Sequence, residues 1–268
     1  TRLVWVEAAG STRLVWVEAA GSVTLEFPDL PTLVQLAKQA GAWVALDNTW
    51  GAGLAFQPFD LLPDVPDNLG VDISVHALTK YPSGGGDVLM GSVITRDVRL
   101  HLRLKHAHMR LGLGVGANDA EAVLRSLPSM PLRYREHDET TRILAQWCQT
   151  REAFAQVLHP ALGDSPGHAH WIALCKNGPG GAAGLFSVVL DARFDPQKVD
   201  AFCDALRVFR LGYSWGGPIS LVVPYDLASM RTVWPRHLAE GTVVRFAIGL
   251  EAVEDLQADI DRALCALR

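Results

Sequence analysis

The apolar positions of this chain follow two periods, and their succession predicts an α/β protein. Residues 71–77 are apolar at every second position, which is the period of a half-buried strand. Residues 29–37 are apolar at 33, 34, 36 and 37 and carry a proline near their start, which is typical of a helix. The same patterns predict strands at 14–18, 43–46, 88–95, 184–190, 220–223 and 243–248, and helices at 97–112, 118–127, 196–208 and 253–267, with a long helix ending near Cys148. The rhythm of strands and helices in the first half indicates an α/β sheet.

Two prolines near the middle of the chain mark the predicted domain boundary. Pro128 and Pro131 interrupt the helical pattern, and the arrangement of strands and helices differs on either side of them. We therefore predict a larger α/β domain in residues 1–130 and a smaller α+β domain in residues 131–268. The last predicted helix is expected to carry its acidic residues on a polar side, namely Glu254, Asp255, Asp259 and Asp261.

The chain begins with an exact tandem duplication. Residues 1–11 and 12–22 are identical, and a structural repeat would have drifted and recurred more than twice. We interpret the duplication as an artefact of assembly or numbering. Only the second copy continues into the following sequence, so only that copy is expected to form the strand at 14–18. The first copy is expected to be disordered or to add an edge strand.

Composition excludes several classes of protein. The 268 residues are 49% hydrophobic and 20% charged, which is typical of a globular protein, and the net charge of -5 offers no basic footprint for nucleic acid. No apolar run reaches the roughly 18–20 residues of a membrane span, and the start lacks the regions of a signal peptide. The four cysteines are widely spaced, as expected of reduced thiols. We expect a cytoplasmic protein with no membrane partner and no metal site.

A lysine and an aspartate follow neighbouring predicted strands. Lys80 comes at the end of the strand at 71–77, just before a serine and three glycines, where a lysine is a candidate nucleophile. Asp47 ends the preceding apolar run. Two strands of one sheet can place both side chains at the same sheet edge, where ligands bind in α/β folds. The alternatives are a solvated lysine at a turn and an aspartate that caps a turn.

One strong base lies inside an apolar strand near the C-terminus. Arg245 is flanked by the apolar residues of 243–248, and a guanidinium in that position needs an anionic partner. Its planar fork suits a carboxylate held through two hydrogen bonds. The alternative is a structural ion pair with Glu251 or another acid of the chain.

Three short motifs together resemble one enzyme family. Residues 47–50 (DNTW), 79–81 (TKY) and 213–217 (YSWGG) occur in the order found in the Cys/Met-metabolism family of pyridoxal-phosphate-dependent enzymes. The resemblance runs from about Thr12 to the C-terminus. It implies the fold type I architecture of pyridoxal-phosphate-dependent transferases, with residues 1–130 as part of the large cofactor-binding domain.

The resemblance implies roles for the residues at the strand ends. Lys80 would hold pyridoxal 5'-phosphate covalently and, once substrate displaces it, would move the Cα proton. Asp47 would keep the pyridine nitrogen protonated, which strengthens the cofactor as an electron sink. Thr79 would bind the cofactor phosphate. Many members carry a serine three residues before the lysine, whereas this chain has Ala77, so one phosphate ligand is lost.

The resemblance also implies a substrate and a reaction. Arg245 would bind the carboxylate of a small sulfur amino acid, and Ser214 and Trp215 would form the other wall of the site. Members that perform γ-chemistry tend to have leucine where this chain has Trp215, so the tryptophan favours β-elimination of L-cystathionine to homocysteine, pyruvate and ammonia. The alternatives are γ-lyase or γ-synthase chemistry, or a catalytically silent fragment.

Family members are longer than this chain, and their additional length is N-terminal. That part supplies a phosphate-binding loop, a tyrosine that stacks on the pyridine ring, and groups that reach into a neighbouring subunit. We expect a chain without them to bind the cofactor weakly, because phosphate contacts and stacking provide much of the affinity. We expect the full-length form to be a homo-oligomer, either a dimer or a tetramer.

Overall fold

A computed structural model describes residues 12–62, 69–175 and 181–268 of the chain. Its first half contains a four-stranded sheet in the order β1-β2-β3-β4, formed by β1 (Leu14–Glu18), β2 (Trp43–Asp47), β3 (Ile73–Ala77) and β4 (Gly91–Ile94). The first three strands are parallel and β4 is antiparallel to β3. The predicted α/β class and the strand in the second copy of the duplication are confirmed, whereas the first copy lies outside the described residues.

The crossover between β1 and β2 is the predicted helix α1 (Leu30–Gln39). The Asp29 carboxylate accepts a hydrogen bond from the Thr32 amide at its start, where a proline occupies the first turn. Gly41 follows the helix with a φ of +70°, a conformation that glycine adopts without strain. The helix buries Leu30 and Val34 against the sheet, because these residues share one helical face.

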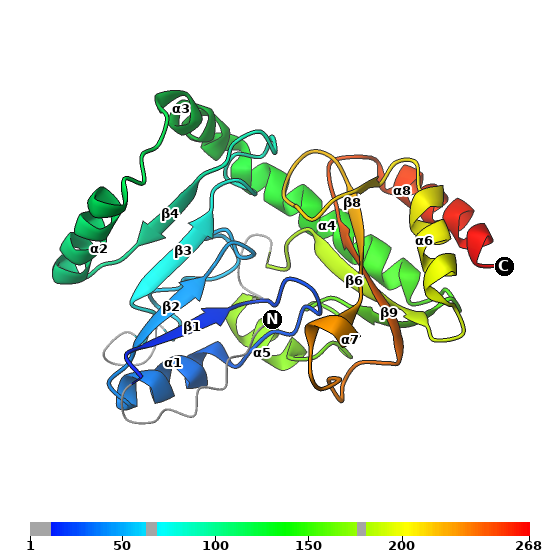
Figure 1. Ribbon diagram of the computed structural model, residues 1–268, viewed down its shortest axis with the longest axis horizontal. Coiled ribbons are helices and arrows are strands. Elements are labelled where there is room, and N and C mark those ends of the chain that lie inside the picture. Colours follow the sequence, from blue (N-terminus) through cyan, green and yellow to red (C-terminus); the bar gives the residue numbers. More distant parts are fainter. Residues whose placement is uncertain (1–11, 63–68, 176–180) are drawn as a thin grey trace.

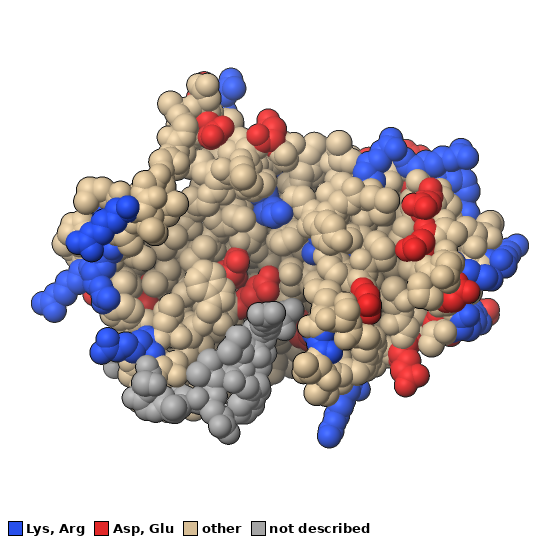
Figure 2. Space-filling model, viewed as in Figure 1, with Lys and Arg blue, Asp and Glu red and all other residues tan. Residues whose placement is uncertain are grey.

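Two helices after β4 form an arm beside the first sheet (Figure 1). They are α2 (Val98–Leu111) and α3 (Ala117–Ser126), and α3 begins after Gly116 rather than at the predicted Asn118. Figure 2 shows Lys and Arg side chains gathered over α2, on the left of the view. The three histidines of α2 are exposed, and the described residues contain no cluster of side chains suited to a metal ion.

The second half contains a five-stranded sheet in the order β5-β6-β9-β8-β7. The strands are β5 (Phe154–Leu158), β6 (Leu185–Asp191), β7 (Arg210–Leu211), β8 (Leu221–Tyr225) and β9 (Gly241–Ala247). All neighbours are antiparallel except β7 and β8. The shorter helices of this half are α5 (His168–Cys175), α6 (Pro196–Ala205) and α7 (Leu227–Met230). The elements β5, α5, β7 and α7 were not predicted.

A long helix joins the two halves. The short 3-10 turn Leu127–Ser129, which contains Pro128, separates α3 from α4 (Met130–Cys148), and Pro131 lies in the first turn of α4. The predicted interruption of the helical pattern is confirmed at Pro128. Helix α4 packs against β5, β6 and α8 (Val253–Leu264), and it crosses the second sheet in Figure 1. The two sheets lie on either side of residue 130, and the division into two domains at that residue stays a prediction.

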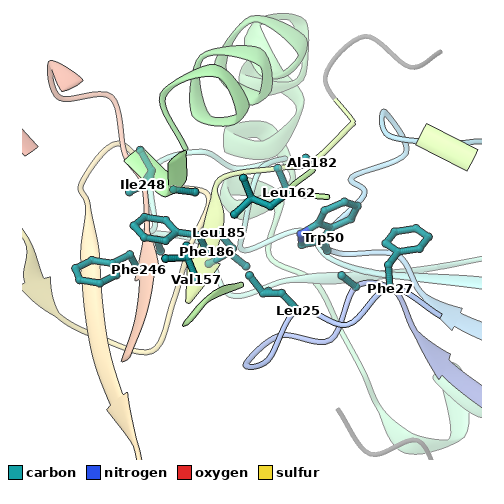
Figure 3. Packing of buried hydrophobic residues seen from close by; sticks show 14 of the residues in the cluster. Leu25, Phe27, Trp50, Val157, Leu162, Ala182, Leu185, Phe186, Phe246 and Ile248 are labelled. Carbon is teal, nitrogen blue, oxygen red and sulfur yellow. The ribbon is translucent and has the colours of Figure 1, made fainter. Parts of the chain in front are cut away.

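One apolar core extends from the first half of the chain into the second (Figure 3). Phe27 and Trp50, from loops beside the first sheet, belong to the same cluster as Leu185 and Phe246 of the second sheet. Each of these side chains contributes roughly 1.5–3 kcal/mol when it is fully buried. The shared core therefore holds the loops that follow β1 and β2 against the second sheet.

One expectation for the last helix was wrong. Asp259 of α8 is fully buried instead of lying on the polar side. Its carboxylate accepts hydrogen bonds from the backbone amides of Arg207, Val208 and Phe209. These three amides and an ion pair with Arg262 compensate the cost of burying the charge, so Asp259 anchors the loop before β7 to α8.

Candidate active site

Asp47 and Lys80 lie in the wall of one cavity. Strands β2 and β3 are parallel neighbours, and Asp47 is in register with Val75, so the two strands end at the same edge of the sheet. Lys80 lies in the turn that follows β3. The cavity has a volume of about 90 Å³ and is lined by Glu18, Ala20, Ser22, Asp47, Thr49, Trp50, Ala77, Lys80, Leu185 and Trp215. The parallel arrangement thus brings the two side chains together as expected.

The Lys80 amine is held by the loop that precedes β8. Its Nζ donates a hydrogen bond of 2.9 Å to the Ser214 hydroxyl and lies 4.2 Å from the ring centroid of Trp215. Burial lowers the pKa of Lys80, and the nearby positive charge of Arg245 lowers it further. A larger fraction of the amine is therefore uncharged at neutral pH than for a lysine in water, as a nucleophile or base requires.

Close packing fixes the backbone around the lysine. Gly216 has a φ of +75°, and a Cβ at this residue would lie 2.8 Å from the Tyr81 amide nitrogen. Only glycine allows the 213–217 loop to approach the lysine turn so closely. Tyr81 is fully buried, and its hydroxyl accepts a hydrogen bond of 2.8 Å from the Gly184 amide, which ties the turn to the second sheet.

Asp47 is oriented by a threonine that we did not single out in the sequence. Its Oδ1 accepts hydrogen bonds from the Thr49 amide at 3.0 Å and the Thr49 hydroxyl at 2.6 Å. The same hydroxyl accepts from the Ala77 amide at 2.9 Å, which joins the ends of β2 and β3. A threonine two residues after a strand-end aspartate is the signal that could have revealed this turn.

Thr79 holds the lysine turn to the segment before β4. Its hydroxyl donates to the Met90 carbonyl at 3.3 Å and accepts from the Met90 amide at 3.1 Å. The single hydroxyl hydrogen is therefore already engaged within the chain. The predicted contact between Thr79 and a phosphate stays a prediction.

Arg245 is a buried cation without a carboxylate partner among the described residues. It is 2% exposed, and its two terminal nitrogens donate to the carbonyls of Ser22 at 2.9 Å and Tyr213 at 2.7 Å. Its Nε is buried and has no hydrogen-bond partner within the described part of the chain. Glu251, considered above as an ion-pair partner, accepts hydrogen bonds from Ser220 instead.

Arg245 keeps its positive charge although it is buried. Burial lowers the pKa of the guanidinium, but an arginine stays protonated because its ordinary pKa is so high. The centroid of the Trp215 ring lies 5.2 Å from the Arg245 guanidinium carbon, so one indole lies beside both Arg245 and Lys80. A buried, incompletely partnered cation of this kind is well suited to bind an anionic ligand.

Glu18 is a second acid in the cavity that the sequence interpretation missed. It ends β1 and is the register partner of Asp47. The last residues of β1, β2 and β3, namely Glu18, Asp47 and Ala77, therefore all line the cavity. Burial raises the pKa of Glu18, and the negative charge of Asp47 raises it further. Its position at the end of the predicted strand 14–18 was the available signal.

Two tryptophans present unused hydrogen-bond donors in the cavity wall. The indole nitrogens of Trp50 and Trp215 are buried, and neither has a hydrogen-bond partner among the described residues. Figure 3 shows the Trp50 nitrogen on the side of the ring that faces Leu185, another lining residue. A buried N–H without a partner is costly, so a hydrogen bond from either indole to a ligand would be favourable.

Comparison with known proteins assigns the family. Residues 5–265 match the family described as Cys/Met metabolism PLP-dependent enzyme. The chain belongs to this family. A relative from Rhizobium johnstonii, provisionally named cystathionine beta-lyase, is 43% identical over 99% of this chain and 61% of its own length. The cystathionine beta-lyase of Bordetella avium is 37% identical over 98% of the chain and 60% of its own length.

Solved structures confirm the fold type I architecture. The methionine gamma lyase from Micromonospora echinospora superposes with a TM-score of 0.81 at 28% identity, over 94% of this chain and 65% of that protein. The chain thus spans about three fifths of the length of the curated relatives described above. No helix within the described residues is long and apolar enough to cross a bilayer.

Proposed function

We propose that this chain carries the cofactor and substrate site of a pyridoxal-phosphate-dependent carbon–sulfur lyase that performs β-elimination on L-cystathionine. The observation that supports it best is the Lys80 amine, which shares a cavity with Asp47 and contacts Ser214 and Trp215. The family assignment supports the cofactor, and the names of both bacterial relatives support the β-lyase branch.

The cavity residues fit pyridoxal 5'-phosphate by their chemistry. Lys80 supplies an amine with a lowered pKa for the covalent attachment, and Asp47 supplies a carboxylate whose Oδ1 is fixed by Thr49. Asp47 would hold a proton on the pyridine nitrogen, and the indole N–H of Trp50 is a further donor. When bound, the cofactor supplies an electron sink for the electron pair left at Cα.

The proton transfers fall to Lys80. Its free amine would be positioned by the contacts that the structure shows, namely the Ser214 hydroxyl and the Trp215 ring. The lowered pKa lets the amine take the Cα proton, and the resulting ammonium can then donate a proton to the departing sulfur. The electron pair of the broken C–H bond would expel the sulfur, which takes the proton from Lys80 and leaves as homocysteine. Hydrolysis of the three-carbon remainder by one water molecule would then release pyruvate and ammonia.

Arg245 is the proposed partner of the substrate carboxylate. Two of its donors are held by the carbonyls of Ser22 and Tyr213, while its Nε remains without a partner. Arg245 does not itself line the cavity, but it lies behind two lining residues, Ser22 and Trp215. From there the guanidinium would orient the substrate by its carboxylate. Trp215 forms the adjacent wall and excludes water from the lysine.

The rival reaction is γ-elimination or γ-replacement on the same scaffold. It is favoured by the likeness to the methionine gamma lyase structure, although that protein is only 28% identical. A third reading is a silent fragment, because the chain spans about three fifths of its relatives and the Thr79 hydroxyl is already engaged by Met90. Product analysis separates the two reactions, since β-elimination yields pyruvate and γ-elimination yields 2-oxobutyrate.

The test begins with the visible absorption spectrum after pyridoxal phosphate is added, beside a Lys80→Ala control. The proposal expects a band that survives desalting and is absent from the control, followed by release of pyruvate from cystathionine. A lysine-dependent band with 2-oxobutyrate as the product would select the γ-reaction. The absence of any lysine-dependent band would support the silent fragment.

The proposed partners are a small sulfur amino acid and further copies of the same chain. In the full-length form we propose a cytoplasmic homo-oligomer, a dimer or a tetramer. Large apolar side chains are exposed just before β4 and along the helical arm, including Leu89, Val98, Met109 and Leu124. Such a concentration of exposed apolar residues is typical of a surface that another chain covers.

A further inference from the structure

The turn between β1 and α1 carries the carbonyl that holds Arg245. Residues 21–26 form this turn, in which the Gly21 amide donates to the Glu26 carbonyl and the Leu25 amide donates to the Gly21 carbonyl. Ser22 lies within it and accepts the 2.9 Å hydrogen bond from Arg245. The position of the turn therefore decides where one of the two carbonyl partners of Arg245 lies.

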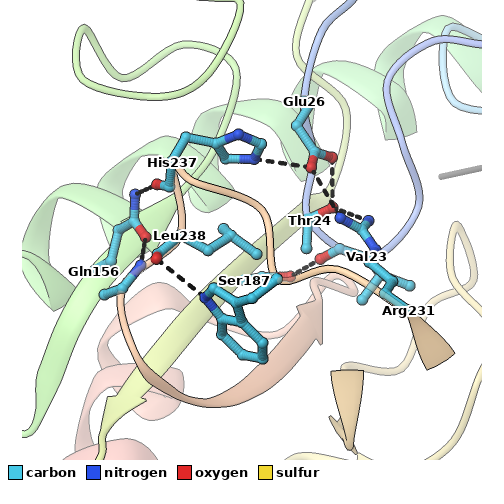
Figure 4. Close-up of polar contacts among 10 residues, drawn as sticks. Val23, Thr24, Glu26, Gln156, Ser187, Arg231, His237 and Leu238 are labelled. Atoms are coloured by element: carbon cyan, nitrogen blue, oxygen red, sulfur yellow. Dashed lines mark hydrogen bonds and ion pairs between the residues drawn. The ribbon is translucent and has the colours of Figure 1, made fainter. Parts of the chain in front are cut away.

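A polar cluster clamps this turn to the connection between β8 and β9 (Figure 4). The Glu26 carboxylate lies 3.0 Å from the His237 ring nitrogen and 3.5 Å from Arg231, and it accepts a hydrogen bond from the Thr24 hydroxyl. Arg231 also donates to the Thr24 hydroxyl at 2.8 Å. We call these four residues, Thr24, Glu26, Arg231 and His237, the Glu26 clamp.

The far side of the clamp is itself braced. The Gln156 side chain of β5 donates to the His237 carbonyl and accepts from the Ala239 amide, both at 2.9 Å. Trp234 donates through its indole to the Leu238 carbonyl at 3.2 Å. The connection at 226–240 is thus held in place by β5, and the turn is attached to it through Glu26 and Thr24.

A second attachment lies between the clamp and Arg245. The buried Ser187 hydroxyl of β6 donates to the Val23 carbonyl at 2.6 Å, and the Val23 side chain packs among Leu238 and Val243. The turn is therefore anchored on the second sheet one residue after Ser22. Together, the clamp and this anchor leave the Ser22 carbonyl little freedom to move.

We propose that Glu26 is a positioning residue, which acts through the Glu26 clamp and the Ser22 carbonyl to hold the Arg245 guanidinium in its carboxylate-binding orientation. The inference rests on the proposed function of Arg245. Without the clamp, the turn retains its anchor at Ser187 but can tilt about it. The Arg245 guanidinium would then sample orientations in which its free donors no longer meet the carboxylate.

The first measurement is the calorimetric affinity of the chain, with pyridoxal phosphate present, for L-alanine, which has the carboxylate but no leaving group. We expect about tenfold weaker binding for Glu26→Ala and about threefold for Glu26→Gln, which keeps one acceptor. Glu240→Ala is the matched control, because Glu240 is an exposed acid on the same connection. It should bind like the wild type.

A double-mutant cycle tests the route through the clamp. Arg231→Ala should weaken the binding of L-alanine about as much as Glu26→Ala does, and the double variant should bind L-alanine no more weakly than either single variant. In steady-state turnover of cystathionine, Arg231→Ala and Glu26→Ala should each raise KM about tenfold and change kcat less than about twofold. A general loss of folding would instead lower kcat in proportion to the folded fraction, which circular dichroism reports.

Arg245→Lys separates this inference from the proposed function. If Arg245→Lys weakens L-alanine binding while the folded Glu26→Gln and Arg231→Ala variants bind normally, the clamp has no positioning role and the inference is overturned. If Arg245→Lys binds normally, the assignment of the carboxylate site to Arg245 fails. If Glu26→Ala does not fold, the Glu26→Gln and Arg231→Ala variants decide the question.

Discussion

The Lys80 amine donates a 2.9 Å hydrogen bond to the Ser214 hydroxyl, although 134 residues separate the two in the sequence. Lys80 follows a strand of the first sheet, whereas Ser214 lies in the loop before β8 of the second sheet. The proposed site is therefore formed by both halves of the chain. A change that separates the two sheets should abolish the site even where each sheet stays folded.

Removal of the Ser214 hydroxyl should slow the chemistry. Ser214→Ala leaves the amine with the Trp215 ring as its remaining contact, so its orientation for proton transfer becomes looser. We expect kcat for pyruvate release to fall about tenfold, which corresponds to the loss of one hydrogen bond to a polar or charged group. Ser214→Thr keeps a hydroxyl and should lose less, and equal losses in the two variants would contradict the role of the hydrogen bond.

Neutralisation of Asp47 should affect the cofactor. Asp47→Asn keeps the shape of the side chain and one acceptor for Thr49, but it removes the negative charge that would keep the pyridine nitrogen protonated. We expect kcat to fall by about 100-fold or more, as for the loss of a preorganised electrostatic contact, with a shift in the visible absorption band. Thr49→Val serves as the comparison, because it loosens the aspartate without removing its charge. An unchanged kcat in Asp47→Asn would refute the assignment.

Asp259 should matter for stability rather than for catalysis. Asp259→Ala leaves the amides of the loop at 207–209 without their acceptor inside the fold. The free energy of unfolding should fall by about 3 kcal/mol, measured by urea denaturation. Asp261→Ala removes an exposed acid of the same helix and its solvated ion pair with Arg151, and it should change the free energy by less than about 1 kcal/mol. Similar losses in both variants would show that the buried contacts are unimportant.

Stability should depend on His137 in mildly acidic solution. Burial, with a smaller contribution from Arg133, lowers the pKa of His137 to about 4, so the folded protein binds its proton only below that pH. The unfolded chain binds the proton below about pH 6.5, so the folded state loses about 1.4 kcal/mol per pH unit between those values. This contribution is fully present above pH 6.5 and is lost as the pH falls toward 4.

The matched measurement is urea denaturation at several pH values between 7 and 4.5. His137→Leu should remove this part of the pH dependence, because leucine does not titrate. His106→Leu changes an exposed histidine of α2 and should keep the wild-type slope. If His137→Leu retains the full slope, other groups account for the acid sensitivity.

Local pattern was enough to predict the part of the site that lies on one sheet. A continuous apolar run placed Asp47 at the end of one strand, and alternating apolar residues placed Lys80 just after the next. Parallel strands in one sheet necessarily end at one edge. The motifs at 47–50, 79–81 and 213–217 likewise indicated the family that the comparison confirmed. Both inferences depend on residues that are close in sequence or on motif order, which a single sequence displays.

Contacts between distant segments were decided only by the tertiary structure. The sequence analysis considered an ion pair between Arg245 and Glu251 as an alternative. In the structure, Arg245 donates to the carbonyls of Ser22 and Tyr213, and Glu251 accepts a hydrogen bond from Ser220. Asp259 was expected on a polar helix face and is buried, because the loop before β7 brings three amides to it. Periodicity describes which face of an element is apolar, whereas the partner of a buried charge depends on which backbone groups the packing leaves unsatisfied.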